Sequence, residues 1–373
     1  MLRFAATVIA IVLLGALGFL AFAPVPIEPV AWRAPPAPGY AGPHARNARL
    51  ANLHSVSIGG EIGPEGMAAG PDGKIYAAVA SGAIVRLNAD GSGLEKWVET
   101  GGRVLGIDFD AAGRLIAADA MRGLLAIGKD RKISLLASGI DGDPLRYANS
   151  VAVAKSGRIY FTDSTRRFGA AAVGGTFLAG VLDIMEHSAS GRLLEFDPAT
   201  RRTRVVMRDL CFANGVALAA DERSLFVVET GEYRVWKVDP AASGLSAKAA
   251  GAPQAKLLLV NLPGYPDNLT RGRDGRIWLG LVKPRGAVVD ALAEYPFLRK
   301  VVMRLPMSLW PVPPAYGHVL AFDEQGAIVA DLQDPSGAVP ETTGVLETAD
   351  RLYIQSLHAA RIAWLPKAAA GLQ

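Results

Sequence analysis

A short turn-and-strand unit recurs along this chain, and the repeat restricts the fold more than any other feature of the sequence. Each copy has a polar turn, then a basic or polar residue, then two apolar residues. Six copies occur at spacings of about 40 residues or more, at residues 72–76, 112–116, 156–160, 222–226, 274–278 and 349–353. Such spacing is typical of four-stranded propeller blades, and alternating apolar residues between turns indicate antiparallel strands. The sequence predicts an all-β, six-bladed β-propeller over residues 51–373, in which segment 53–58 adds a strand to the last blade and closes the ring.

A fixed offset from these turns selects one position in each repeat. The residue eight positions before the turn starts the innermost strand of its blade, at the mouth of the central channel. In four of the six repeats this residue has a carboxylate or amide side chain, and the six positions are Glu65, Leu105, Asn149, Asn214, Asp267 and Thr342. The propeller therefore brings two carboxylates and two amides together on one axis.

Glu65, Asn149, Asn214 and Asp267 are predicted to bind Ca²⁺. Two carboxylates facing each other repel, and a divalent cation removes that cost. Oxygen ligands without Cys or His select a hard ion, and ligands from several loops favour Ca²⁺ over Mg²⁺. Asn-Gly and Asp-Asn pairs are also common turn formers, and Glu65 alone could cap a strand. The offset shared by all four residues favours the metal site.

The first 23 residues form a candidate membrane anchor. Residues 4–22 are apolar and uncharged, which is enough to span a bilayer as one helix, and Arg3 precedes them. A positive N-terminal flank places the rest of the chain outside the cytoplasm. The alternative is a cleaved signal peptide ending at Ala23 and a secreted or periplasmic protein, but Pro24 should hinder that cleavage. Residues 24–50 are rich in proline and are expected to form an extended stalk.

Two long insertions interrupt the repeats, at residues 169–187 and 288–305. Both are expected to form short helices that pack over the ring, cover a substrate, or rest on the membrane. His318 and His358 lie at or beside predicted strands, where structural histidines are more common than catalytic bases. Asp163-Ser164-Thr165 follows a strand and is expected either at the channel mouth or in a turn.

Several classes of protein are disfavoured. The net charge of +4 without a long basic run argues against nucleic-acid binding. Cys211 is the only cysteine, so no intrachain disulfide can form. The sequence contains no Gly-x-Ser-x-Gly elbow, no Gly-x-Gly-x-x-Gly after a strand and no His-Glu-x-x-His.

Six motifs resemble the strictosidine synthase-like family, in particular its adipocyte plasma membrane-associated branch. They are PEG at 64–66, ANSVAV at 148–153, IYFTDS at 159–164, GRLLEFDP at 191–198, FANGVAL at 212–218 and GYPDNL at 264–269. The resemblance extends from about residue 61 to 364. It implies a six-bladed propeller related to gluconolactonases, paraoxonases and diisopropylfluorophosphatase, with calcium ligands matching Glu65, Asn149, Asn214 and Asp267. It also implies a type II membrane topology and arylesterase-like activity.

One departure concerns the reaction that gives this family its name. True strictosidine synthases use a glutamate shortly before the inner strands of the last blade. The best-matching positions here are Thr343 and Gly344, and the nearby Glu341 needs a shifted register. Alkaloid condensation is therefore disfavoured.

The sequence thus predicts a calcium-dependent hydrolase of esters or lactones, including phosphotriesters. Asp267 would attack the substrate or activate water, while Glu65, Asn149 and Asn214 hold the ion. One alternative is a non-catalytic, membrane-tethered binding propeller with structural calcium, and another is a condensing enzyme. A pocket that leaves the ion open at the channel mouth would favour the enzyme.

Overall fold

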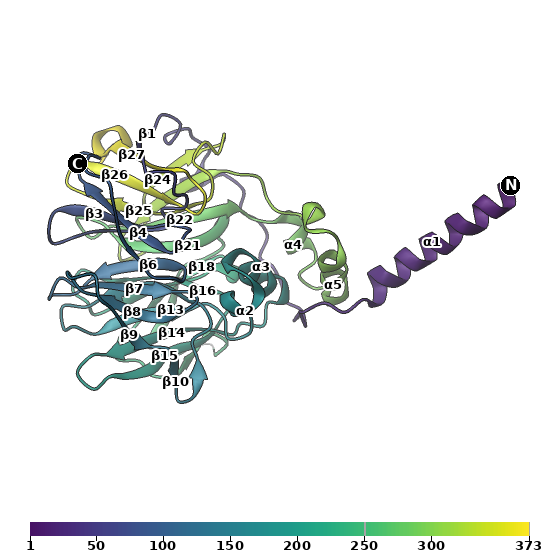
Figure 1. Ribbon diagram of the computed structural model, residues 1–373, viewed down its shortest axis with the longest axis horizontal. Helices are drawn as coiled ribbons and strands as arrows, with labels where there is room; N and C mark the ends of the chain where they lie inside the picture. Colours follow the sequence, from purple (N-terminus) through teal and green to yellow (C-terminus); the bar gives the residue numbers. More distant parts are fainter. Residues whose placement is uncertain (250, 373) are drawn as a thin grey trace.

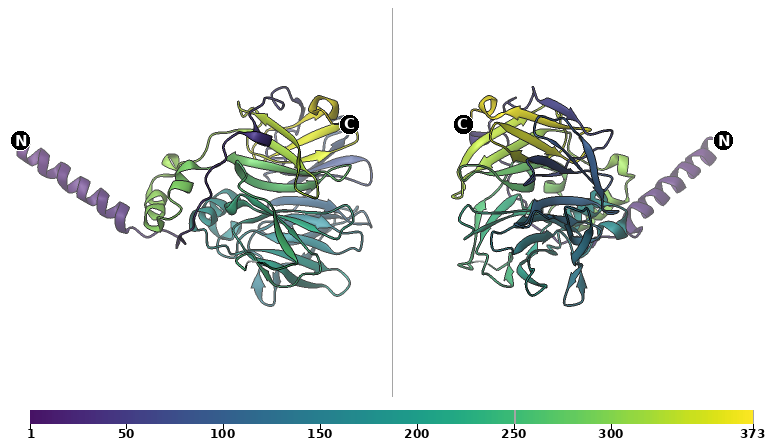
Figure 2. Two further views of the ribbon diagram at one scale, coloured as in Figure 1. Left: turned by 180° about the vertical axis from the view of Figure 1, so that it is seen from behind. Right: turned by 60° about the vertical axis from the view of Figure 1, so that its left-hand side comes forward.

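The computed structural model describes residues 1–249 and 251–372, and the strands of these residues form a closed ring of six blades (Figures 1 and 2). Blade one consists of β2 (Gly66–Ala69), β3 (Lys74–Ala78), β4 (Ala83–Asn88) and β5 (Glu95–Glu99). Blade two consists of β6 (Val104–Phe109), β7 (Leu115–Asp119), β8 (Gly123–Ile127) and β9 (Ile133–Ala137). Blade three consists of β12 (Ala148–Val153), β13 (Ile159–Asp163), β14 (Gly191–Asp197), β15 (Arg202–Leu210) and β19 (Leu245–Ser246). A small hairpin, β10 (Gly139–Ile140) and β11 (Asp143–Pro144), precedes blade three.

Blades four to six complete the ring. Blade four consists of β16 (Ala213–Leu218), β17 (Leu225–Glu229), β18 (Arg234–Val238) and β20 (Ala255–Leu259). Blade five consists of β21 (Gly264–Arg271), β22 (Ile277–Pro284), β23 (Gly317–Phe322) and β24 (Ile328–Asp334). Blade six consists of β25 (Thr342–Glu347), β26 (Arg351–Ser356), β27 (Arg361–Pro366) and β1 (His54–Ser57). β1 pairs antiparallel with β27, so the earliest strand is the outermost strand of the last blade. The predicted propeller and its closing strand are confirmed.

Apolar side chains fill the spaces between neighbouring blades. Each hydrophobic cluster between blades draws residues from the two sheets that flank it. Between blades four and five, for example, Phe226 and Phe322 meet edge to face with ring centroids 5.9 Å apart. This packing buries both faces of each sheet and holds the inner strands at fixed positions around the axis.

The inner strands share an irregularity near the channel mouth. Within the described chain, five inner strands change register there, at Val104/Gly106, Ala148/Val151, Ala213/Val216, Pro266/Leu269 and Thr342/Gly344. A bulge bends its strand and redirects the side chain of the extra residue. Asn149, Asn214 and Asp267 all lie within these interruptions, which frees their side chains from the alternation of the ladder.

Both long insertions are helical and cover the same face of the ring (Figures 1 and 2). Blade three contributes α2 (Ala170–Val173) and α3 (Thr176–Glu186), and blade five contributes α4 (Ala287–Ala291), α5 (Pro296–Arg304) and η3 (Met307–Leu309). Pro296 occupies the start of α5, where its missing N–H costs no hydrogen bond. Three further 3₁₀ turns are η1 (Gly42–His44), η2 (Thr230–Glu232) and η4 (Lys367–Ala370).

The N-terminal helix α1 (Leu2–Phe22) projects from the helical side of the ring (Figure 1). The most apolar 18-residue window within residues 3–22 has a mean hydropathy of 2.5, and none of that window is buried. By length and composition, this helix can cross a membrane.

The proline-rich segment after α1 lies against the ring rather than standing free. Ile27 is fully buried in the cluster beneath the helical insertions. Trp32 stacks on His187 with ring centroids 4.0 Å apart.

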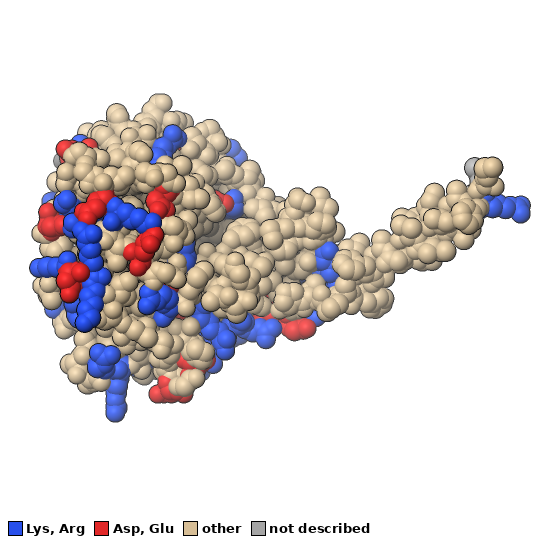
Figure 3. All heavy atoms as spheres, in the orientation of Figure 1, with Lys and Arg blue, Asp and Glu red and all other residues tan. Residues whose placement is uncertain are grey.

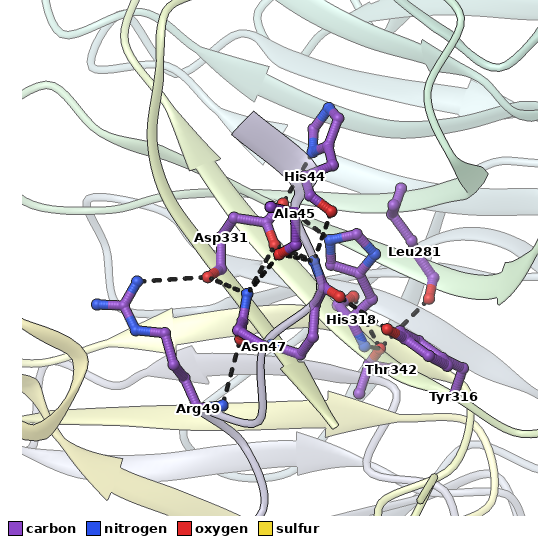
Figure 4. A network of polar contacts seen from close by, with 10 residues as sticks. His44, Ala45, Asn47, Arg49, Leu281, Tyr316, His318, Asp331 and Thr342 are labelled. Carbon is purple, nitrogen blue, oxygen red and sulfur yellow. Dashed lines mark hydrogen bonds and ion pairs between the residues drawn. The ribbon is translucent and has the colours of Figure 1, made fainter. Parts of the chain in front are cut away.

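Figure 4 shows how the end of this segment is fastened to blade five. His44 Nδ1 and His318 Nε2 lie 2.8 and 2.9 Å from the same oxygen, Asp331 Oδ2. Burial raises the pKa of Asp331, but the hydrogen bonds from His318 and His44 outweigh it, and the net pKa is far below the ordinary value. An ionised carboxylate only accepts hydrogen bonds, so both imidazoles donate to it. His318 thus bonds to Asp331 within blade five and is not among the residues that line the cavity at the channel mouth.

Candidate functional site

A cavity of about 440 Å³ opens at the channel mouth beneath the helical insertions. Its lining includes all four predicted ligand residues, Glu65, Asn149, Asn214 and Asp267. Each of these side chains comes from a different blade, and each residue is at most 5% exposed. The other two mouth positions lie outside the lining. Leu105 packs into the apolar cluster under the insertions, and the Thr342 hydroxyl bonds to the backbone of His318 in blade five.

Two hydroxyl groups determine how the asparagine amides point. Ser164 Oγ donates its proton to the carbonyl oxygen of Ala213 at 2.7 Å, so toward Asn149 it can only accept. The amide nitrogen of Asn149 therefore faces Ser164, at 2.9 Å, and its oxygen faces away. Ser164 thus orients the amide of Asn149.

The same arrangement occurs in blade four. Thr230 Oγ1 donates to the carbonyl oxygen of Pro266 at 2.7 Å and accepts from Asn214 Nδ2 at 3.3 Å. Consequently Asn149 Oδ1 and Asn214 Oδ1 are both buried and find no donor among the residues that the structure describes. A buried carbonyl oxygen without a partner costs about 1–3 kcal/mol. These two oxygens are the strongest structural sign that the cavity takes a positively charged or proton-donating ligand.

The two buried carboxylates differ in their partners. Glu65 Oε2 lies 2.6 Å from Arg103 Nη2, a residue that the sequence reasoning missed. Burial raises the pKa of Glu65, and the charge of Arg103 opposes this rise. Burial also raises the pKa of Asp267 well above its ordinary value, and the charge of Glu65 raises it further. The chain's own groups thus disfavour a charged Asp267, whereas a bound cation would favour it.

A second polar group on the cavity wall was also missed as a site. Glu341 lies between Lys283, with 2.8 Å between Oε1 and Nζ, and the Nδ1 atom of His358. Burial raises the pKa of Glu341, but the hydrogen bonds from His358 and Lys283 lower it to about 2. The hydrogen bond to Glu341 raises the pKa of His358. A charged carboxylate and a basic imidazole therefore stand at the cavity rim.

A simple signal could have revealed these residues. Glu65, Arg103 and Glu341 each immediately precede the inner strand of their blade, at β2, β6 and β25. The position just before an inner strand is thus a second position at the channel mouth. In blades two and six the eight-residue offset selects Leu105 and Thr342, and so it passes over Arg103 and Glu341.

The upper walls of the cavity are apolar and come from the insertions. They include Phe177, Val181 and Ile184 of α3, Val302 and Met303 of α5, and Trp310 and Val312 after η3. A ligand with a polar reacting group and an apolar body matches this division between floor and walls.

The donor set suits a hard divalent cation. It combines two amide oxygens that have no donor among the described residues with two buried carboxylates, and none of these four ligand groups is a sulfur or an imidazole. Arg103 pairs with Glu65 and not with Asp267. Asp267 therefore has no cationic partner among the described residues.

Two family models match the sequence: strictosidine synthase over residues 149–238, and the N-terminal region of strictosidine synthase-like proteins over residues 42–87. The strictosidine synthase-like 6 protein of Arabidopsis thaliana is 33% identical over 315 residues, which cover 83% of this chain and 80% of that protein. The adipocyte plasma membrane-associated protein of Bos taurus is 31% identical over 377 residues, covering 95% of this chain and 87% of that protein.

Solved structures share the fold at low sequence identity. A gluconolactonase from Xanthomonas campestris superposes with a TM-score of 0.60 and 20% identity, covering 90% of this chain and 98% of that one. The calcium-binding protein regucalcin from Agrobacterium tumefaciens superposes with a TM-score of 0.54 and 14% identity, covering 84% of this chain and 93% of that one.

Proposed function

The chain belongs to the strictosidine synthase-like family, and from this membership and the cavity we propose that it is a calcium-dependent hydrolase of esters or lactones. One observation carries the proposal. Two buried oxygens, Asn149 Oδ1 and Asn214 Oδ1, find no donor in the part of the chain that the structure describes, and they share one cavity with Glu65 and Asp267. The gluconolactonase and the calcium-binding regucalcin that share the fold support the same chemistry by analogy.

Glu65, Asn149, Asn214 and Asp267 would hold the ion, which leaves part of a shell of about 6–8 oxygens for water and substrate. When bound, Ca²⁺ acts as a Lewis acid on the carbonyl or phosphoryl oxygen of the substrate. Asp267 would then either attack the electrophilic centre or take a proton from an attacking water. His358, whose pKa is raised by Glu341, can supply a proton to the departing alkoxide.

The open cavity favours an enzyme over a propeller whose calcium is only structural. A structural ion needs no space above it, whereas apolar walls and a rim of Glu341 and His358 continue above this floor. Condensation is an alternative because Glu341 lines the cavity. Glu341 is, however, already paired with Lys283 and His358, which disfavours that role.

We also propose that α1 stays attached as a single membrane span, with the N-terminus in the cytoplasm and the propeller outside. The association of related proteins with the adipocyte plasma membrane supports a membrane location. Cleavage after Ala23, giving a secreted or periplasmic enzyme, is the alternative.

The direct test is a screen of aryl esters, lactones and phosphotriesters with the purified full-length protein. We expect turnover that a calcium chelator abolishes and added Ca²⁺ restores. Turnover that persists unchanged in chelator would refute calcium dependence, and a protein that binds Ca²⁺ but turns over none of these substrates would favour the binding propeller.

A further inference from the structure

The anchor helix and the helical insertion of blade five are joined directly. Arg304, the last residue of α5, donates to the carbonyl oxygens of Ala23 and Leu20 at 2.6 and 2.9 Å. Leu20 belongs to the last turn of α1, where carbonyl groups lack partners within the helix and a positive charge is favourable. The end of α1 is therefore fixed to α5.

The residues after α1 do not form a free linker. The backbone N–H groups of Glu28 and Val30 donate to the side chain and the backbone of Glu186 in α3, at 2.9 and 2.8 Å. Arg299 of α5 is fully buried, donates to the carbonyl oxygen of Met185 at 3.0 Å, and also bonds to Val30. These contacts fix the direction of α1 relative to the ring, so a bilayer that holds α1 must begin beside α5.

The surface at that level is apolar. Large apolar side chains of the two insertions are each more than two-fifths exposed there: Phe177, Phe297, Leu298, Met307, Leu309 and Val312. We call these six residues the apolar collar. Figure 3 shows that the part of the protein between the ring and α1 has few charged side chains, whereas the ring itself has many. An exposed apolar surface that continues into a membrane helix matches the interfacial region of a bilayer.

The apolar collar is continuous with the cavity. Phe177 and Val312 belong to both, and Trp310, which follows Leu309, lines the cavity wall. A molecule that leaves the bilayer beside α5 would thus meet apolar side chains all the way to the polar floor.

From these contacts we propose that the apolar collar rests on the same bilayer that holds α1, so that the cavity opens toward lipid and takes apolar esters or lactones from the membrane. The bilayer contact rests on the proposed membrane span of α1, and the substrate class rests on the proposed hydrolase function.

The contact can be tested with one fluorophore on the full-length protein in lipid nanodiscs. Cys211 is the only cysteine and is fully buried, so Leu309→Cys can be labelled selectively with an environment-sensitive dye. Lipids brominated near the headgroup end of their acyl chains should quench this dye by about half or more. The control is Val329→Cys, an exposed apolar residue of β24 outside the collar, whose dye should not be quenched. Equal quenching at both positions, or no quenching at residue 309, overturns the proposal. No quenching at residue 309 is also the result expected if a second copy of the chain, rather than lipid, covers the collar.

A second experiment tests the substrate route. Leu298→Glu with Leu309→Glu places charges on the collar without touching the cavity lining. Hydrolysis of a long-chain ester dissolved in the bilayer should fall by about tenfold or more, because charged side chains leave the interface. Hydrolysis of a short, water-soluble aryl ester should stay the same, and Leu135→Glu with Val329→Glu should change neither rate. Equal loss on both esters overturns the membrane route. If wild type hydrolyses no ester, the hydrolase function fails, and the fluorophore still decides the bilayer contact.

Discussion

Arg103 and Glu65 form a buried ion pair at the floor of the cavity, with 2.6 Å between Nη2 and Oε2. Both side chains are less than a tenth exposed, so each depends on the other for neutralisation. If Glu65 is also a calcium ligand, both Arg103 and the bound Ca²⁺ neutralise its charge. The contribution of Arg103 and that of Ca²⁺ can be separated by experiment.

Arg103→Met should destabilise the protein strongly only without calcium. Removing one partner of a buried pair typically costs about 3–5 kcal/mol because the other charge is left uncompensated. Bound Ca²⁺ would compensate Glu65 in the variant, so much of the loss should be recovered. Thermal unfolding of wild type and variant, each in chelator and in calcium, measures this. An equal loss of stability in both conditions would mean that Glu65 does not contact the ion.

Ser164→Ala should weaken calcium binding although Ser164 would not be a ligand. Its hydroxyl forces the Asn149 amide to present oxygen to the cavity. Without this partner the amide can rotate, and losses of such supporting bonds typically cost about 10–100-fold in metal affinity. Calorimetric titration with Ca²⁺ gives the affinity. Ser92→Ala, which removes a hydroxyl from an exposed turn, is the matched control; unchanged affinity in Ser164→Ala would show that the amide orientation does not matter.

The sequence predicted the blades because each blade repeats the same local turn chemistry, which needs no knowledge of distant contacts. It also predicted the cavity positions of Asn149, Asn214 and Asp267, since their bulges fall at a similar distance from the turn. In blade six the bulge falls at Thr343, so the offset selected Thr342, whose hydroxyl bonds to blade five. Arg103 was not predicted because the eight-residue offset selects Leu105 in blade two and passes over the position just before β6. Its pairing with Glu65 could not be predicted either, because Glu65 belongs to another blade.

The attachment of the proline-rich segment was also beyond the sequence. Its composition predicts an extended chain. Whether an extended chain stands free or lies on a surface depends on partners such as Glu186 and Asp331, which are far away in sequence. Those partners are what convert the expected stalk into a fixed connection between α1 and the ring.

Asp183→Asn should stabilise the protein at alkaline pH. Asp183 of α3 is fully buried, and burial raises its pKa to about 7, against an ordinary value of 3.8. Between these values the unfolded state has lost the proton that the native state keeps, so wild-type stability falls as pH rises from 3.8 to about 7 and stays reduced above it. The variant cannot ionise there. Its advantage in melting temperature should therefore be small near pH 4 and largest at pH 8. Asp141→Asn, in an exposed turn, should show no such trend; a constant difference across pH would refute the raised pKa.

The purified protein should retain α1 uncleaved. Pro24 would directly follow a cut after Ala23, and the end of α1 is held by Arg304. Intact mass spectrometry of protein purified from its own membranes should therefore show Met1 or the loss of Met1 alone. A mass that begins at Pro24 would instead establish a cleaved signal peptide and remove the membrane anchor.

Asp267→Asn separates a catalytic role from a structural one. The substitution keeps the size of the side chain and one oxygen that can face an ion, but it removes the charge and any nucleophilic or basic carboxylate. Because Asp267 is buried and repelled by Glu65, its negative charge costs the protein stability when no cation is bound. In chelator, the variant should therefore be at least as stable as wild type. At saturating calcium, ester or lactone hydrolysis should fall by about 10²–10⁴-fold, the range expected for loss of a group that transfers protons in the transition state.

Asn149→Ala is the control, because it removes a neutral oxygen and leaves Asp267 in place. It should weaken calcium binding, and excess Ca²⁺ should restore most of the hydrolysis rate, whereas no concentration of Ca²⁺ should rescue Asp267→Asn. Rescue of Asp267→Asn by calcium would mean that Asp267 acts only as a ligand. The attacking water would then need another base, and the remaining carboxylates in the cavity are Glu65, paired with Arg103, and Glu341, which is ionised with a pKa of about 2 and contacts His358. Of these, Glu341 is the carboxylate that contacts an imidazole, that of His358, so Glu341→Gln would be the next substitution to test for loss of turnover.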